Sequence, residues 1–191
     1  SAASHRQASL VRLAKNGGKG AAVISGLYVA DNMNFTHAIQ IDADGQHDLA
    51  AVTDFLDQAH HNPQALVCGY PIYDQTVPLS RLWGRELTNF WVHVNTRSKA
   101  LRDAMCGFRV YPLAQTLPVL PSVKTRRMDF DPDIVVRLIW AGVTVINRPV
   151  RVTYPKDGIS HFRGFSDNMR ISRLHAGHFC TMLLRRMGLA K

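Results

Sequence analysis

The feature that most constrains the fold is an alternation of short apolar segments with segments of helical periodicity in the first part of the chain. Apolar runs of strand length lie at 9–13, 37–41 and 65–69. Between them, residues 20–31 and 49–60 carry apolar side chains at the spacing of one helix face. Alternation of this kind is typical of a parallel sheet covered by helices. We therefore predict an α/β fold with a mostly parallel sheet.

The remaining elements are expected from periodicity and from the positions of proline and glycine. They are a helix beginning after Pro78, a helix over 131–141, strands over 143–147 and 150–154, and a last helix over about 166–188. The helix after Pro78 has one apolar face, which carries Trp83, Leu87, Phe90, Trp91 and Val94. No internal repeat or low-complexity linker divides the sequence, so residues 1–191 are expected to form one domain.

The composition limits the class of protein. Hydrophobic residues make up 46% of the 191 residues and charged residues 19%, which is enough for a core and unlike a disordered chain. Cys68, Cys106 and Cys180 lie far apart and form no C-x-x-C pair. This spacing disfavours a disulfide framework and a zinc finger, and we expect a cytoplasmic protein. No apolar run approaches the roughly 20 residues of a membrane span.

The net charge of +9 is concentrated in the C-terminal third. Residues 121–191 carry 13 basic and 5 acidic side chains, whereas residues 1–120 carry 10 and 9. This excess indicates an anionic partner, which is phosphate, nucleic acid or a membrane surface. In the last helix, arginines flank an apolar stripe. Such a helix can lie in the headgroup layer on the inner face of a membrane, or its stripe can pack on the domain itself, and the sequence leaves both open.

An acidic pair directly follows the apolar run at 37–41. Asp42 and Asp44 lie at the end of this expected strand, where open α/β sheets bind ligands. Two carboxylates on a chain that leaves a strand can turn toward one hard cation, such as Mg²⁺ or Mn²⁺. The alternative is a solvated turn that is rich in aspartate. The position after an apolar strand favours the metal site.

Two further segments carry candidate groups. Residues 16–20 form a glycine-rich loop around Lys19, and the backbone N–H groups of such a loop can bind an anion. The spacing is not that of a P-loop, and a simple turn before a helix is the alternative. Asp103 and Arg109 lie six residues apart around Gly107, either as groups of a functional site or as a surface ion pair.

Five motifs follow one another along the chain. They are N-x-G-K-G-x-A from Asn16, D-A-D-G-Q-H at 42–47, D-x-x-x-G-F-R-x-Y at 103–111, F-x-x-D at 130–133 and G-x-S-H-F at 158–162. This ordered set resembles glycosyltransferase family 2. Within that family it looks most like the polyprenol-phosphate sugar transferases, the branch of dolichyl-phosphate mannose synthase. The resemblance implies an α/β GT-A fold, that of the nucleotide-diphospho-sugar transferases, with the sheet flanked by helices.

The resemblance also implies roles on the donor side of a site. Asp42 and Asp44 would hold Mg²⁺ or Mn²⁺ and the donor diphosphate, and Gln46 would be within reach of the same metal. Lys19 lies in the first motif and is assigned to donor binding.

On the acceptor side, the resemblance implies that Asp103 and Arg109 are the catalytic candidates. Lys156, His161 and Arg163 would lie near the phosphates of the donor or the acceptor.

The sequence departs from the family pattern in two places. The family normally opens with a strand that carries P-x-Y-N-E and a second strand whose acidic end holds the base and ribose. Neither is present, so we expect an N-terminally truncated fold. Relatives often have G-S-R after the third strand, where this chain has G-Y-P at 69–71. Arg81 is the nearest basic residue and the candidate substitute.

Together these features predict an inverting, metal-dependent glycosyltransferase with a nucleotide-diphosphate sugar as donor. A lipid-phosphate acceptor is already a nucleophile and needs no general base, whereas a hydroxyl acceptor needs a carboxylate such as Asp103. A non-catalytic fragment of the same fold is one alternative. A basic nucleic-acid-binding module is another, although the sequence has none of the standard motifs of that class.

Overall fold

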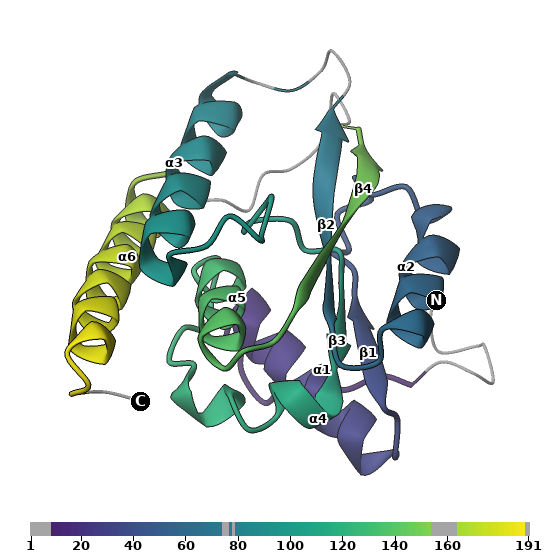
Figure 1. The fold of residues 1–191 in the computed structure, drawn as a ribbon. Coiled ribbons are helices and arrows are strands. Elements are labelled where there is room, and N and C mark those ends of the chain that lie inside the picture. The colour runs from purple at the N-terminus through teal and green to yellow at the C-terminus, as the bar shows by residue number, and fades with distance from the viewer. Residues whose placement is uncertain (1–8, 74–76, 78, 154–163, 190–191) are drawn as a thin grey trace.

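A four-stranded sheet lies at the centre of the molecule, with helices on both of its faces (Figure 1). The computed structural model describes residues 9–73, 77, 79–153 and 164–189, and only the backbone of 79–81 and 164–165. The strands are β1 (His37–Gln40), β2 (Leu66–Tyr73), β3 (Arg109–Pro112) and β4 (Val145–Val152). Their order in the sheet is β1-β3-β2-β4.

The sheet mixes parallel and antiparallel pairs. Strand β2 is parallel to β4, whereas β3 is antiparallel to both β1 and β2. Three strands therefore run in one direction and β3 runs between two of them in the other. The predicted α/β class is confirmed, but the mostly parallel sheet holds only in part. No local pattern indicated β3, because a strand of four residues is too short to show an alternation of side chains.

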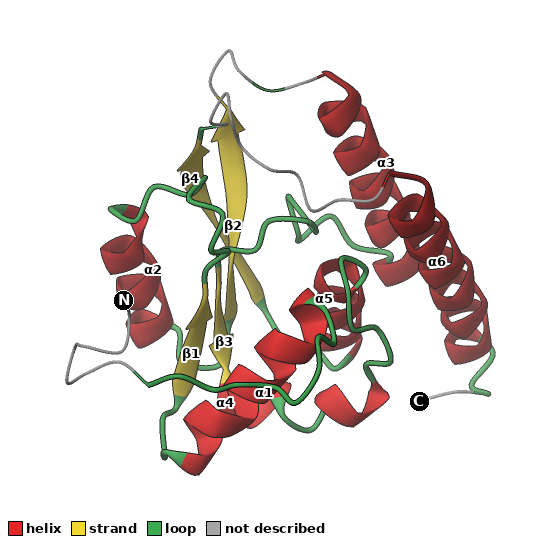
Figure 2. Ribbon diagram, turned by 180° about the vertical axis from the view of Figure 1, so that it is seen from behind, coloured by secondary structure: helices red, strands yellow, loops and turns green. Residues whose placement is uncertain are grey.

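The helices form layers on the sheet (Figures 1 and 2). They are α1 (Lys19–Asn32), α2 (Ala51–His61), α3 (Leu79–Thr96), α4 (Leu113–Thr116), α5 (Phe130–Trp140) and α6 (Gly164–Arg186), with a 3-10 turn at Leu120–Ser122. Helix α2 covers one face of the sheet, and α1 and α5 lie on the other. Helices α3 and α6 pack side by side and form an outer layer, in which α3 contacts α5.

The alternation of side chains along the strands supplies two cores. Leu66 and Cys68 of β2 pack in the core that contains α5, whereas Val67 between them packs in the core under α2. Tyr111 and Val110 of β3 divide in the same way. A sheet that is buried on both faces needs apolar side chains in both directions, which explains the continuous apolar run at 65–69.

Two strand predictions are corrected by the structure. Residues 9–13 are irregular, with Leu10 76% and Val11 50% exposed, and no strand of the described sheet pairs with them. The two strands expected on either side of Pro149 form the single strand β4, which pairs with β2 along its whole length. Because β4 is an edge strand, a proline without an N–H group is tolerated there.

Three of the five residues on the apolar face of α3 lie outside the core, whereas Trp91 and Val94 are half-buried. Trp83, Leu87 and Phe90 are 78%, 61% and 57% exposed, whereas Asn89 and Asn95 are buried. The buried asparagines bond to neighbouring backbone, as in the 2.9 Å contact from the Ala104 N–H to Asn89 Oδ1, so polar residues can face inward. Among the described helices, none combines the length and the hydropathy of a membrane span.

Candidate functional site

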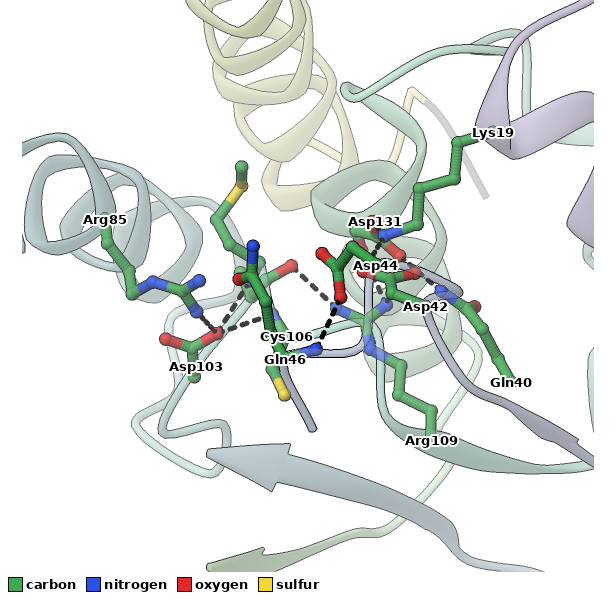
Figure 3. Close-up of polar contacts among 12 residues, drawn as sticks. Lys19, Gln40, Asp42, Asp44, Gln46, Arg85, Asp103, Cys106, Arg109 and Asp131 are labelled. Atoms are coloured by element: carbon green, nitrogen blue, oxygen red, sulfur yellow. Dashed lines mark hydrogen bonds and ion pairs between the residues drawn. The ribbon is translucent and has the colours of Figure 1, made fainter. Parts of the chain in front are cut away.

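Three segments that are far apart in sequence meet beside the end of β1. Lys19 is the first residue of α1, Asp42 and Asp44 follow β1, and Asp131 is the second residue of α5. Figure 3 shows their side chains gathered together, with Lys19 reaching toward Asp131. A helix N-terminus favours negative charge, so the first turn of α5 is a suitable place for a carboxylate.

Lys19 is shared by two carboxylates. Its Nζ lies 2.7 Å from Asp42 Oδ2 and 2.6 Å from Asp131 Oδ2. Burial lowers the pKa of Lys19, but the attraction of Asp131 and Asp42 outweighs it and raises the pKa above its usual value. Lys19 is therefore an ammonium ion whose charge is balanced inside the protein.

Asp131 is the buried acidic group at the centre of this cluster. Its side chain is only 3% exposed, and its Oδ1 accepts a hydrogen bond of 3.1 Å from Gln40 Nε2. The same oxygen lies 3.6 Å from Arg109 Nη1. Burial raises the pKa of Asp131, but Lys19 and Arg109 outweigh this effect and hold the pKa below its usual value. Asp131 is therefore an ionised group that links two cations.

Arg109 lies beneath the site and is fully buried. Its guanidinium donates to the carbonyl oxygens of Ala104 at 2.7 Å and Asp131 at 2.9 Å, and to Tyr111 Oη at 3.4 Å. Tyr111 in turn donates to Gln40 Oε1 at 2.9 Å. A side chain with no exposed surface has nothing to offer a substrate directly. This placement favours a positioning role for Arg109 over the catalytic contact that the sequence predicts.

Glycines allow the motifs to approach one another closely. A Cβ atom at Gly107 would overlap the carboxylate of Asp42. A Cβ atom at Gly20 would lie 2.5 Å from Cβ of Phe130. Gly18 has a φ of 90°, in the left-handed region that favours glycine. The glycine-rich motifs are therefore needed for contact between α1, α5 and the segments after β1 and before β3.

A second cluster lies between α3 and the loop before β3. Asp103 Oδ1 accepts three hydrogen bonds, from Arg85 Nη1 at 2.6 Å and from the backbone N–H groups of Met105 at 2.9 Å and Cys106 at 2.6 Å. Asp103 is 3% exposed, so the predicted alternative of a surface ion pair with Arg109 is wrong. These bonds orient Asp103 and hold Arg85 beside it (Figure 3).

Basic side chains also lie beside the C-terminal half of β2, where the sequence departs from the family pattern. The Arg102 guanidinium is 4.1 Å from the centre of the Tyr70 ring, and that of Arg85 is 5.8 Å from the centre of the Tyr73 ring. Arg85 and Arg102 therefore place positive charge beside this half of the strand. The side chain of Arg81, the candidate from the sequence, lies outside the described part of the chain.

The three proposed metal ligands differ in their surroundings. Asp42 is 24% exposed and has Oδ2 bonded to Lys19, whereas Asp44 is exposed and accepts the Gln46 N–H at 3.1 Å. In the part of the chain that the structure describes, no three His, Cys, Asp or Glu side chains form a cluster that could hold a metal. Carboxylate and amide oxygens suit a hard cation. These ligands therefore fit Mg²⁺ or Mn²⁺ only with further oxygen atoms from a substrate.

Sequence reasoning missed two residues of the site. Asp131 lies within the motif F-x-x-D, to which no role was assigned. Arg85 lies one helical turn after Arg81, and the spacing of four residues was the available signal that both share a helix face. Three predicted phosphate-binding residues lie outside the described residues, namely Lys156, His161 and Arg163.

No protein-family model matches the chain. The chain is similar to a dolichyl-phosphate beta-glucosyltransferase of Dictyostelium discoideum, with 26% identity over 133 residues. The matched region makes up 65% of this chain and 40% of the relative, so the chain spans well under two thirds of the relative's length. The similarity supports a relationship to glycosyltransferases, but not the mannose synthase branch.

Proposed function

We propose that this protein is a glycosyltransferase that moves a sugar from a nucleotide-diphosphate donor to dolichyl phosphate or a related polyprenyl phosphate. The observation that carries the proposal is the contact between residues of four separate motifs. Lys19 bonds to both Asp42 and Asp131, and Asp42 packs against Gly107. The similarity to a dolichyl-phosphate beta-glucosyltransferase supports the reaction class and the choice of acceptor. A GT-A fold is part of the same proposal.

On the donor side, Asp42, Asp44 and Gln46 would hold Mg²⁺ or Mn²⁺. Such an ion, when bound, stabilises the negative charge of the departing diphosphate. The chain's own residues supply the geometry. Asp42 keeps Oδ1 for this task, because Oδ2 is bonded to Lys19. Asp44 is exposed at the turn and is oriented by the Gln46 N–H, so it faces a donor that arrives from solvent.

On the acceptor side, Arg85 is the residue that we assign to the acceptor phosphate. A phosphate oxygen is already a nucleophile, so it needs positive charge to orient it rather than a base. The Arg85 side chain is 19% exposed and is fixed by Asp103 at 2.6 Å. Attack on the face of the sugar opposite the diphosphate would invert the anomeric carbon. In this arrangement Asp103 positions Arg85.

The outer layer of α3 and α6 is suited to the membrane that carries such an acceptor. Trp83, Leu87 and Phe90 form an exposed apolar face on α3. On α6, Phe179 and Leu183 are also partly exposed. Helix α6 carries the exposed basic residues Arg170, Arg173 and Arg186, whereas Arg185 donates to the carbonyl of Trp140. We propose that this layer rests on anionic lipid of a cytoplasmic membrane face, because basic and apolar side chains together favour the headgroup region.

The direct test is transfer of a radiolabelled sugar from a sugar nucleotide to a short polyprenyl phosphate in the presence of Mn²⁺. Asp44→Asn should reduce turnover about 100-fold or more, which is the usual effect of removing one group that stabilises developing charge. Asp57→Asn is the matched control, because Asp57 is an exposed aspartate on α2. Its turnover should equal that of the unchanged protein.

Three results would contradict parts of the proposal. Turnover by Asp44→Asn at the level of the control would remove the metal assignment. Binding of sugar nucleotide without transfer to any polyprenyl phosphate would favour the non-catalytic alternative. Salt-sensitive retention on DNA-cellulose without binding of sugar nucleotide would favour the nucleic-acid-binding alternative.

A further inference from the structure

We propose that Lys19 is a positioning residue that fastens the segment 42–47 to α5 and thereby sets the orientation of Asp42 for the metal. The inference deepens the proposed function, because it rests on Asp42 as a metal ligand. It assigns Lys19 to the protein's own carboxylates rather than to the donor, where the sequence placed it.

The ammonium group of Lys19 is occupied by two carboxylates of the protein. Its Nζ lies 2.7 Å from Oδ2 of Asp42 and 2.6 Å from Oδ2 of Asp131. Its side chain is 18% exposed. With its ammonium group engaged on both sides, Lys19 is poorly placed to turn toward a diphosphate.

Asp131 is fixed by partners on two strands of the sheet. Asp131 is held by Gln40 from β1 and by Arg109 from β3, and it lies in the first turn of α5. It is thus anchored to the sheet as well as to a helix. Lys19 connects this rigid point to Asp42, on the chain that has just left β1.

Asp42 is therefore confined from two directions. Lys19 binds one of its oxygens, and Gly107 leaves room for its carboxylate but for no additional atom. A ligand oxygen that is fixed before the metal arrives binds it more tightly than a mobile one, and partners of ligands have this effect generally.

The charges of the cluster allow Lys19 to be removed without a change in the net charge of the cluster. Lys19 and Arg109 carry two positive charges, and Asp42 and Asp131 carry two negative charges. Lys19→Met alone leaves two carboxylates with a single cation and should lower the melting temperature strongly. The double variant Lys19→Met/Asp131→Asn removes one charge of each sign, so the net charge of the cluster is unchanged. Its melting temperature should recover most of that loss.

Two measurements on the double variant test the proposal. Hydrogen–deuterium exchange should be faster in a peptide that covers 42–47 and unchanged in peptides of α2. Affinity for Mn²⁺ alone should fall about tenfold or more, as is usual when the partner of a ligand is lost. Lys15→Met is the control, because Lys15 is exposed and lies outside the cluster. It should change neither measurement.

The outcomes separate this inference from the proposed function. If the double variant exchanges and binds Mn²⁺ like the unchanged protein, Lys19 only balances the charge of Asp131 and the inference is overturned. If the unchanged protein binds no Mn²⁺, the metal assignment fails, and exchange at 42–47 still decides whether Lys19 fastens this segment.

Discussion

Asp42 is the residue at which the separate motifs meet. Lys19 bonds to its Oδ2, and the Cα of Gly107 lies against its carboxylate. Asp44, two residues later, is exposed and is oriented mainly by the turn that contains it. The two aspartates of one motif therefore have different tasks, since one is built into the protein and the other faces solvent.

Gly107→Ala is expected to disturb the site through Asp42. The added methyl group would overlap the carboxylate, so Asp42 must move and its bond to Lys19 must lengthen. We expect a loss of about 1–3 kcal/mol in the free energy of unfolding, measured by denaturant titration, and a severe loss of transfer activity.

The matched control is Gly26→Ala, on a helix and with open space around the new methyl group. This variant should keep its activity and gain about 0.5–1 kcal/mol, because alanine favours a helix over glycine. Equal activity of the two variants would show that the contact between Gly107 and Asp42 has no role in the site.

Asp103→Asn distinguishes the two kinds of acceptor. Asparagine keeps an oxygen for the N–H groups of Met105 and Cys106 but loses the charge that holds Arg85. For a phosphate acceptor we expect a higher KM for the acceptor with kcat largely retained, measured by steady-state kinetics. A fall in kcat of about 100-fold with little change in KM would instead identify Asp103 as a general base for a hydroxyl acceptor.

Helices α3 and α6 pack through both apolar and polar groups, with the Trp91 ring 6.3 Å from that of Phe179 and 6.5 Å from that of His175. Asn95 donates to the carbonyl of His175 at 3.3 Å, and Trp140 donates to the carbonyl of Asn95 at 3.0 Å. His178 lies 2.9 Å from Asp133 on α5. His175 is 4% exposed, and its ring nitrogens have no hydrogen-bond partner among the described residues. Burial, together with His178, lowers the pKa of His175 to about 4.

Stability should therefore fall in mild acid through His175. In the unfolded chain this histidine takes up a proton near pH 6.5, whereas in the folded protein it does so only near pH 4. The loss in the free energy of unfolding that His175 causes is absent above pH 6.5 and grows as the pH falls. It reaches about 3 kcal/mol below pH 4. Denaturant titrations at several pH values should show that the free energy of unfolding falls less steeply with decreasing pH in His175→Gln than in the unchanged protein. An unchanged decline in that variant, matching His60→Gln on the exposed side of α2, would contradict the assignment.

Helices α3 and α6, which lie side by side in Figure 2, carry several large apolar side chains that are exposed. A groove of about 650 Å³ between these helices is lined by Leu87, Trp91, Ile171 and Phe179. Trp83, which precedes Gly84 in the lining of the groove, is 78% exposed. Exposed apolar side chains of this size, gathered on one face, mark a contact surface.

Sedimentation with vesicles tests the membrane contact. The protein should pellet with vesicles that contain anionic lipid, remain in solution with neutral ones, and be released by salt. The triple variant Trp83→Ser/Leu87→Ser/Phe90→Ser should lose this binding and keep its melting temperature, since these side chains are exposed. Leu56→Ser, at an exposed leucine of α2, is the control and should pellet normally. Unchanged pelleting of the triple variant would exclude α3 as the membrane-facing helix.

Local pattern was sufficient for most elements and for the acidic pair. The apolar run at 37–41 contains β1, and the run at 65–69 covers only the first half of β2, which extends to Tyr73. The predicted helices match α1, α2, α3, α5 and α6 to within a few residues. Asp42 and Asp44 follow β1 as expected. These features depend on neighbours in sequence, so periodicity and local composition reveal them.

Contacts between distant segments were decided only by the tertiary structure. Strand β3 runs opposite to its two neighbours, and nothing local in four residues could indicate that. The apolar spacing of α3 predicted a helix but not that its polar side would face inward. Arg109 pairs with Asp131 and Asp103 with Arg85, because burial leaves each charge to find the partner that the packed chain brings within reach. Sequence thus determined which groups are present, and packing determined which of them meet.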